Sequence, residues 1–187
     1  MSDKRIGGEA RSGGVLVVFA GLPGTGKTTL ARLLATQYRA AHVRVDAVEA
    51  AMRRAGHTSE SIGATGYLVA REVALSCLQV GTPVVIDAVS PVSEARQGWR
   101  ELAATASARL KVIEVELSDP GEHRRRVEGR TSDIDGLIVP TWQQVIERAY
   151  QPWDEQRDGP RLKLSNNSDP ETGLDAVLAY IGEWTAP

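Results

Sequence analysis

The sequence predicts a single doubly wound α/β domain, a mostly parallel five-stranded sheet with helices on both faces. Short apolar runs rich in β-branched residues, typical of buried parallel strands, alternate with longer segments of helical periodicity. Strands that alternate with helices imply right-handed crossovers and a mostly parallel sheet. The chain has 187 residues, which suits one domain with a buried core.

The first half of the chain is predicted to carry two strands, three helices and a loop. The apolar run at residues 15–20 is predicted as a central strand, and a helix follows at about 27–38. A second strand at 41–45 ends at Asp46, and a short helix comes directly after it. A loop at 56–63 precedes a long helix at about 64–80.

The second half continues the alternation. Residues 83–87 form a third buried strand, and a helix opens near Pro91 and extends to about residue 107. A fourth strand at 110–117 is followed by a basic helix at 122–130, a polar loop at 131–140 and a helix at 141–150. Residues 162–164 form a fifth strand, and the final helix begins at 169–171. The segments 56–63 and 130–140 are expected to be the most mobile.

Composition and charge limit the classes of protein that fit. The net charge of -2 provides no global basic field, which argues against a nucleic-acid partner without excluding a local patch. The one cysteine, Cys77, cannot form an intramolecular disulfide, so a cytoplasmic protein is expected. No apolar run approaches the ~20 residues of a membrane span. Residues 1–14 are polar and glycine-rich and are expected to be a disordered leader, while 15–187 form the domain, as a monomer or homodimer.

A glycine-rich loop between the first strand and the first helix carries the chemistry. It matches the phosphate-binding pattern of glycine, four residues, glycine, lysine and serine or threonine. Glycines let several backbone N–H groups surround a phosphate, and the helix that follows points its positive end at the same anion. The expected nucleotide-binding residues are Gly21, Leu22, Pro23, Gly24, Thr25, Gly26, Lys27, Thr28 and Thr29. Lys27 is expected to reach the β- and γ-phosphates of ATP, Thr28 to bind Mg²⁺, and Thr29 to contact the α-phosphate.

Other motifs separate the classes of P-loop protein. A regulatory GTPase usually carries Asp-x-x-Gly after a strand and Asn-Lys-x-Asp for guanine, and neither occurs here. A motor ATPase would have paired acids at the end of its Walker B strand and a helical lid domain, whereas Asp87 stands alone in a short chain. A small kinase remains.

The combination of the P-loop, Asp46 after the second strand and Val85-Ile86-Asp87-Ala88 at the third resembles the predicted-kinase P-loop family. Its relatives include chloramphenicol phosphotransferases, zeta toxins, gluconate and shikimate kinases and the kinase domain of phage polynucleotide kinase. The resemblance implies an ATP- and Mg²⁺-dependent transfer of the γ-phosphoryl group to an alcohol. Asp46 would accept the proton of the attacking hydroxyl, or else cap the helix starting at Ala47. Asp87 would hold Mg²⁺ together with Thr28, or else act as a cap or turn residue.

Arginines after the fourth strand are the remaining expected part of the nucleotide site. In the resembling kinases, arginines at the start of a lid, here about residues 121–142, stabilise charge on the transferred phosphoryl group. The Arg-x-x-x-Arg spacing points to Arg126 and Arg130, and then to Arg124 as a nucleotide contact, although a solvated helix face explains the same charges. The loop 165–168 either lies against the adenine or is a plain turn.

The acceptor is less clearly marked. Arg53, Arg54, Tyr67 and Arg96 are candidate acceptor contacts beside Asp46, and Arg96 is placed to reach back over the phosphates. Shikimate and gluconate kinase acceptor motifs have no match here, so the acceptor stays open, as does ATP against GTP. The leading prediction is a small-molecule kinase. Its alternatives are a polynucleotide 5′-hydroxyl kinase, a zeta-toxin-like sugar-nucleotide kinase, and a nucleotide-binding regulator with little turnover.

Overall fold

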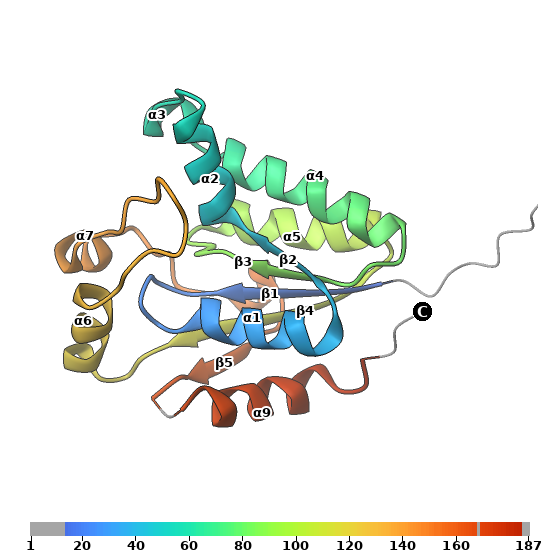
Figure 1. Ribbon diagram of the computed structural model, residues 1–187. Coiled ribbons are helices and arrows are strands. Elements are labelled where there is room, and N and C mark those ends of the chain that lie inside the picture. The colour runs from blue at the N-terminus through green and yellow to red at the C-terminus, as the bar shows by residue number, and fades with distance from the viewer. Residues whose placement is uncertain (1–13, 168, 185–187) are drawn as a thin grey trace, which may run out of the picture.

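The computed structural model describes residues 14–167 and 169–184, which form a five-stranded, all-parallel sheet covered by helices (Figure 1). The strands are β1 (Val15–Ala20), β2 (Ala41–Arg44), β3 (Val84–Asp87), β4 (Arg109–Glu116) and β5 (Leu162–Ser165), in the spatial order β2-β3-β1-β4-β5. The helices are α1 (Lys27–Tyr38), α2 (Val45–Arg54), α3 (Ser59–Ile62), α4 (Thr65–Gln79), α5 (Ser93–Thr105), α6 (Pro120–Glu128), α7 (Trp142–Ile146), α8 (Glu155–Asp158) and α9 (Pro170–Ile181). The predicted doubly wound α/β fold is confirmed.

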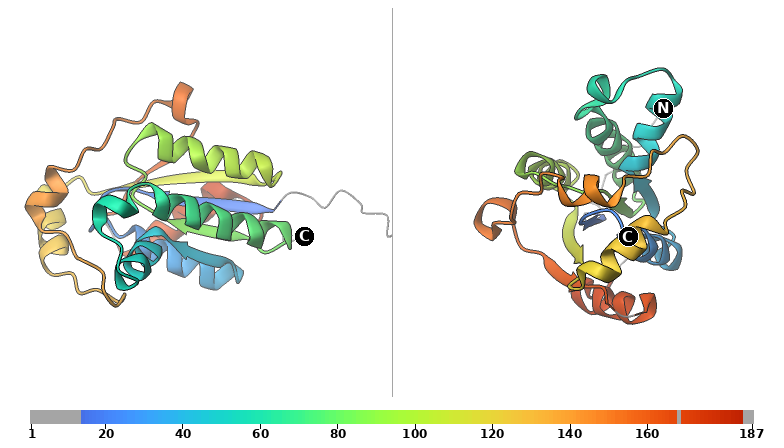
Figure 2. Two further views of the ribbon diagram at one scale, coloured as in Figure 1. Left: turned by 90° about the horizontal axis from the view of Figure 1, so that it is seen from above. Right: turned by 90° about the vertical axis from the view of Figure 1, so that its left-hand side faces the viewer.

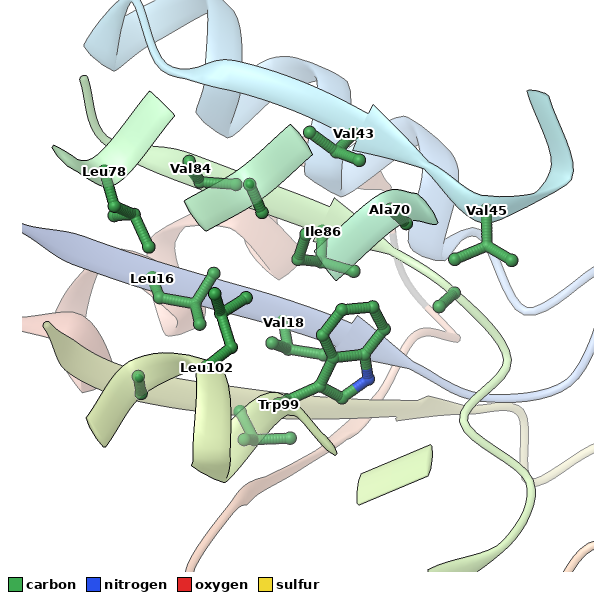
Figure 3. Close-up of a cluster of buried hydrophobic side chains, with 14 residues drawn as sticks. Leu16, Val18, Val43, Val45, Ala70, Leu78, Val84, Ile86, Trp99 and Leu102 are labelled. Carbon is green, nitrogen blue, oxygen red and sulfur yellow. The ribbon is translucent and has the colours of Figure 1, made fainter. Parts of the chain in front are cut away.

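Two apolar clusters lie on opposite faces of the sheet, because successive side chains of a strand point to opposite sides. Leu16 and Val18 of β1 pack with Trp99 of α5 and with α4 on one face (Figure 3). Val17 and Phe19 pack with α1 and α9 on the other. All six residues of β1 are buried, which is why its sequence is continuously apolar rather than alternating.

The carboxyl ends of the strands all meet at one edge of the sheet, where α6 and α7 lie (Figure 1). At that edge the loop after β3 is tied to the P-loop, since the Gly21 N–H donates to the Val89 carbonyl at 3.1 Å. Trp99 donates from Nε1 to Ser90 Oγ at 3.0 Å and so fixes this loop to the core. These two hydrogen bonds fix the loop after β3 at the edge of the sheet where open α/β folds bind their ligands.

The chain between α6 and α7 crosses this edge toward α2, as the right-hand view of Figure 2 shows. Arg44 donates two hydrogen bonds to Asp133, from Nη1 to Oδ2 at 2.8 Å and from Nη2 to Oδ1 at 3.1 Å. Arg54 donates to the Asp135 carbonyl. The segment predicted as a mobile loop is thus held to β2 and α2 by two arginines.

Several predicted boundaries are wrong by a few residues. The second strand ends at Arg44, and Asp46 lies in the first turn of α2. The predicted loop at 56–63 contains α3, whose N-cap Thr58 accepts a hydrogen bond from the Ser61 N–H. The predicted helix at 141–150 stops at Ile146, and α8 was not predicted at all. Its four residues depend on Asp154, whose side chain accepts from two N–H groups of the turn.

The predicted disordered leader lies outside the described residues except for Gly14. The Gly14 carbonyl accepts a hydrogen bond from the Arg109 N–H at 2.8 Å, so this last residue of the predicted leader is bonded to β4. None of the helices in the described part of the chain is long and apolar enough to cross a membrane.

Candidate active site

The P-loop connects β1 to α1 at the carboxyl edge of the sheet. Its glycines Gly21, Gly24 and Gly26 have φ values of 131°, 86° and 91°, in the left-handed region that side chains with a Cβ rarely adopt. Space is also limiting: a Cβ on Gly24 would lie 2.5 Å from Val127 Cγ2, and one on Gly26 would lie 2.2 Å from Asn166 Nδ2. The glycine pattern therefore reflects both the turn and the close packing around it.

The loop leaves backbone donors available for an anion. Gly26 is the N-cap of α1 and has no side chain that could occupy the first N–H groups of the helix. Those N–H groups, with the positive end of the helix dipole, form a general site for phosphate. This geometry agrees with the phosphate-binding role predicted for Gly26, Lys27 and Thr28.

A cavity of about 290 Å³ opens directly above the P-loop. Its walls come from the loop, from α1, from β2 and from the segment after α6. The lining residues are Gly24, Gly26, Lys27, Thr28, Thr29, Arg32, Arg44, Arg130, Thr131 and Asp133. Four of these side chains are cationic and one is a carboxylate, so the cavity suits a polyanion.

Asp46 faces Arg130, one of the residues that line this cavity. Arg130 Nη2 lies 3.8 Å from Asp46 Oδ2, and both side chains are only partly exposed. Asp46 does not cap a helix, because α2 starts at Val45 and its N-cap position is Arg44. The structure thus brings together two residues, 84 positions apart, that were predicted to act on the same phosphoryl group.

The other two predicted lid arginines differ in position. Arg126 pairs with Glu122 at 2.6 Å and donates to the Asn166 carbonyl at 3.3 Å, next to the P-loop. Arg124 is 60% exposed and pairs with Glu128 on the outer face of α6. Helical spacing puts Arg124 and Arg126 on different faces, and Arg124 does not line the P-loop cavity, so its predicted nucleotide contact stays a prediction.

Asp87 is buried at the end of β3, beside two basic side chains. Its Oδ2 lies 3.5 Å from Arg44 Nε and 4.0 Å from His42 Nε2. Burial lowers the pKa of His42, although Asp87 raises it, which favours neutral imidazole near pH 7. The Asp87 carboxylate therefore balances the charge of Arg44. It ends β3, which pairs with β1, the strand that leads into the P-loop and Thr28. The described residues contain no cluster of further acidic ligands around it.

Two residues that hold the P-loop from behind were missed by sequence analysis. His123 of α6 is buried, and its Nε2 lies 2.8 Å from the Pro23 carbonyl, so Nε2 carries the proton and donates. Asn166, after β5, donates from Nδ2 to the Thr25 carbonyl at 2.8 Å. Trp142 of α7 packs edge-on against His123, with ring centroids 5.1 Å apart. By binding two loop carbonyls, His123 and Asn166 hold the P-loop against α6 and against the loop after β5.

No local signal in the sequence could have found this pair. His123 and Asn166 are 100 and 141 residues from the carbonyls they bind, and neither belongs to a recognised motif. Asn166 does fall in the loop that was predicted to lie either against the adenine or in a plain turn.

Arg96 is the clearest error among the predicted acceptor contacts. Its side chain is fully buried, pairs with Asp158 at 2.8 Å, and lies over the ring of Trp153 at 4.5 Å. It also donates to four backbone carbonyls, those of Ser90, Pro91, Gln151 and Pro152. Arg96 fastens the segment before α8 to α5 and does not reach the phosphates.

Tyr67 also has a structural bond where a substrate contact was predicted. Its hydroxyl accepts from the Ser90 N–H at 3.0 Å, and burial raises the pKa of Tyr67 to about 12. Its ring lines a second cavity of about 380 Å³ between α4 and α5, separate from the one over the P-loop. Of the two remaining candidates, Arg53 pairs with Glu49 on α2 at 3.4 Å, and Arg54 donates to the Asp135 carbonyl.

Comparison with known proteins finds similarity both in sequence and in fold. The chain is 29% identical over 180 residues to the ribose 1,5-bisphosphate phosphokinase PhnN of Achromobacter xylosoxidans (strain A8), covering 89% of this chain and 91% of that protein. Similar folds include an unliganded sugar kinase from Janibacter sp. HTCC2649 (TM-score 0.67, 17% identity, 90% of this chain and 94% of that one). They also include the Mycobacterium tuberculosis APS kinase CysC (TM-score 0.65, 20% identity, 90% of this chain and 98% of that one). A gluconokinase from Sinorhizobium meliloti 1021 is similar as well (TM-score 0.60, 18% identity, 91% of this chain and 93% of that one).

A family model described as AAA domain (AAA_33) matches residues 16–150. The match spans more than half of the chain, and it contains the P-loop, Asp46, Asp87 and Arg130. The protein therefore belongs to this AAA-domain family of P-loop small kinases.

Proposed function

We propose that the protein transfers the γ-phosphoryl group of ATP to a hydroxyl group of a small-molecule acceptor. The observation that carries the proposal is the contact of Asp46 with Arg130, which itself lines the cationic P-loop cavity. One member can accept a proton and the other can stabilise phosphoryl oxygens, so the two roles of a kinase site meet at one point.

The chain's own residues supply binding and charge stabilisation. The P-loop N–H groups and Lys27 hold the phosphates, and Arg130 stabilises charge on the oxygens of the γ-phosphoryl group. Mg²⁺ bound by Thr28 and Asp87 would neutralise the β- and γ-phosphate charge. For that, Asp87 would exchange part of its contact with Arg44 for the ion or one of its waters.

In the proposed transfer step, one P–O bond forms, one P–O bond breaks and one proton moves. The acceptor oxygen attacks the γ-phosphorus, the bond from that phosphorus to the β–γ bridging oxygen breaks, and ADP leaves. The proton of the acceptor hydroxyl goes to the Asp46 carboxylate. A phosphate acceptor is already ionised and would need no base, and a carboxylate beside it would repel it. Asp46 at this position therefore favours a hydroxyl as the reacting group, even though the relative from Achromobacter is named for a bisphosphorylated sugar.

The test is an acceptor screen followed by Asp46→Asn. ADP release with ATP and Mg²⁺ is measured over sugars, sugar phosphates, antibiotics, nucleosides, nucleotide sugars and 5′-hydroxyl oligonucleotides. With the acceptor found, Asp46→Asn is expected to keep its ATP affinity and to lose kcat by at least ~10²-fold, the usual contribution of a general base.

Asp175→Asn, an exposed carboxylate on α9, serves as the matched control and should be unchanged. An unchanged kcat in Asp46→Asn, or a phosphoanhydride product seen by ³¹P NMR, would overturn the hydroxyl assignment. ADP release that occurs only with 5′-hydroxyl oligonucleotides would identify a polynucleotide kinase. Absence of acceptor-dependent release from every class would favour a nucleotide-binding regulator.

A further inference from the structure

One face of α2 carries alternating charges beyond the predicted base. Asp46, Glu49 and Arg53 are three and four residues apart and so lie along one stripe of the helix. Helical side chains lean toward the N-terminus, and Arg53 follows this rule, with Nη2 at 3.4 Å from Glu49 Oε2. Its guanidinium therefore lies one turn closer to Asp46 than its position in the sequence suggests.

Arg53 is incompletely bonded in this position. Its Nε and Nη1 are buried and have no hydrogen-bond partner among the described residues, and the Glu49 contact is long. Buried polar groups are normally paired, and an exception calls for an explanation. An arginine of similar exposure elsewhere in the fold is paired more closely. Arg71 meets Glu101 at 3.1 Å with an exposure of 27%, against 23% for Arg53.

Arg53 is the cation of this stripe that the nucleotide leaves free. Burial raises the pKa of Glu49, and Asp46 adds to the effect, while Arg53 lowers it. Arg130 pairs with Asp46, so two guanidinium groups face two carboxylates. Once the phosphates of ATP engage Arg130, Arg53 is the cation left on the acceptor side.

We infer that the acceptor carries an anionic group in addition to its reacting hydroxyl, and that Arg53 binds this group. The ligand oxygens replace the long Glu49 contact after a small rotation of the guanidinium, whose planar fork fits a phosphate, sulfate or carboxylate. The inference rests on the proposed function, because Asp46 marks where the hydroxyl lies.

The spacing sets the size of the acceptor. Asp46 and Glu49 are separated by three residues, a rise of about 4.5 Å along the helix. The anionic group bound above Glu49 is therefore about one helical turn from the hydroxyl, roughly the span of one sugar ring. Compact hydroxy-anions fit this spacing better than extended chains.

The first arm of the test measures binding without turnover. Inorganic phosphate, sulfate and acetate are titrated by calorimetry into protein saturated with a non-hydrolysable ATP analogue and Mg²⁺, which keeps the P-loop occupied. Wild type and Arg71→Gln are expected to bind at least one of these anions, and the anion that binds best identifies the preferred chemistry. Arg53→Gln is expected to bind it about 10- to 100-fold more weakly, the usual effect of losing charged hydrogen bonds. Equal binding by Arg53→Gln, or no binding by wild type, would overturn the inference.

The second arm compares neutral and anionic acceptors of the same skeleton, such as ribose with ribose 5-phosphate and glucose with gluconate. The anionic member should have the higher kcat/KM, and Arg53→Gln should raise its KM and leave kcat nearly unchanged. Equal use of neutral and anionic members would contradict the subsite while leaving the kinase intact. Anion binding that depends on Arg53, without transfer to any acceptor, would keep the subsite and contradict the proposed function.

Folding is checked on the same variants. Arg53→Gln removes two buried, unpaired N–H groups, so its melting temperature without ligand is expected to equal or exceed that of wild type. A purely structural Arg53 would instead lower it. Arg53→Lys, which keeps the charge but loses the fork, should recover part of the anion binding.

Discussion

The buried ion pair between Arg96 and Asp158 makes a stability prediction that can be worked out from the contacts. Both side chains are almost fully buried, and Nη1 meets Oδ2 at 2.8 Å. Removing one partner of a buried pair costs about 3–5 kcal/mol. In Asp158→Asn the guanidinium keeps its four backbone carbonyl acceptors, so we expect the lower end, about 3 kcal/mol. For a chain of this size that is a fall of about 6–12 °C in Tm.

The loss should also depend on pH. Hydrogen bonds from Arg157 hold the pKa of Asp158 well below its usual range despite burial, and bonds from the Asp154 N–H and Arg96 add to the effect. A carboxyl with a depressed folded pKa stabilises the protein above its unfolded pKa, and this contribution fades as the pH falls. With an unfolded pKa of about 3.9, the difference between wild type and Asp158→Asn should be about 0.7 kcal/mol smaller at pH 3.5 than at pH 7.

Urea unfolding followed by circular dichroism at the two pH values measures both quantities. Asp175→Asn on the surface of α9 is the control and should change stability by less than about 0.5 kcal/mol. If Asp158→Asn lowers the free energy of unfolding by less than about 1 kcal/mol at pH 7, the pair does not stabilise the fold as a buried ion pair should. A loss that grows on acidification would refute the assigned ionisation.

Three further changes probe the nucleotide site. Lys27→Ala is expected to abolish the thermal stabilisation by ATP and Mg²⁺, because the P-loop ammonium is gone; a retained shift would show that Lys27 does not hold the phosphates. His123→Leu removes the donor to the Pro23 carbonyl and should weaken ATP binding about 5- to 10-fold, with partial recovery in His123→Gln; equal affinities in calorimetry would show that the P-loop needs no brace. Asp133→Asn removes the carboxylate among the residues that line the cavity and breaks its ion pair with Arg44. ATP should therefore bind up to about 5-fold more tightly, and protease should cut the 130–140 segment faster. Weaker ATP binding would contradict this prediction.

Much of the fold could be predicted from local pattern. The continuous apolar run of β1, the glycines of the P-loop and the leucine stripe of α1 specify a buried strand, a phosphate loop and an amphipathic helix. These features act over a few residues, and each has one dominant physical cause. The same holds for Asp46 and Asp87, which follow or end predicted strands and so fall at one edge of a parallel sheet.

Roles that depend on distant partners were harder to predict. Arg96 and Arg130 are both arginines in or next to predicted helices, yet Arg96 is buried against the ring of Trp153 and Arg130 faces Asp46. His123 and Asn166 gained their function only because α6 and the loop after β5 pack behind the P-loop. The sequence by itself determined the sheet, the longer helices and the phosphate-binding loop, since turn geometry and hydrophobic periodicity are local. Only the tertiary structure decided which arginines are buried, which face the cavity and which side chains hold the loop, because those contacts join residues separated by up to 141 positions.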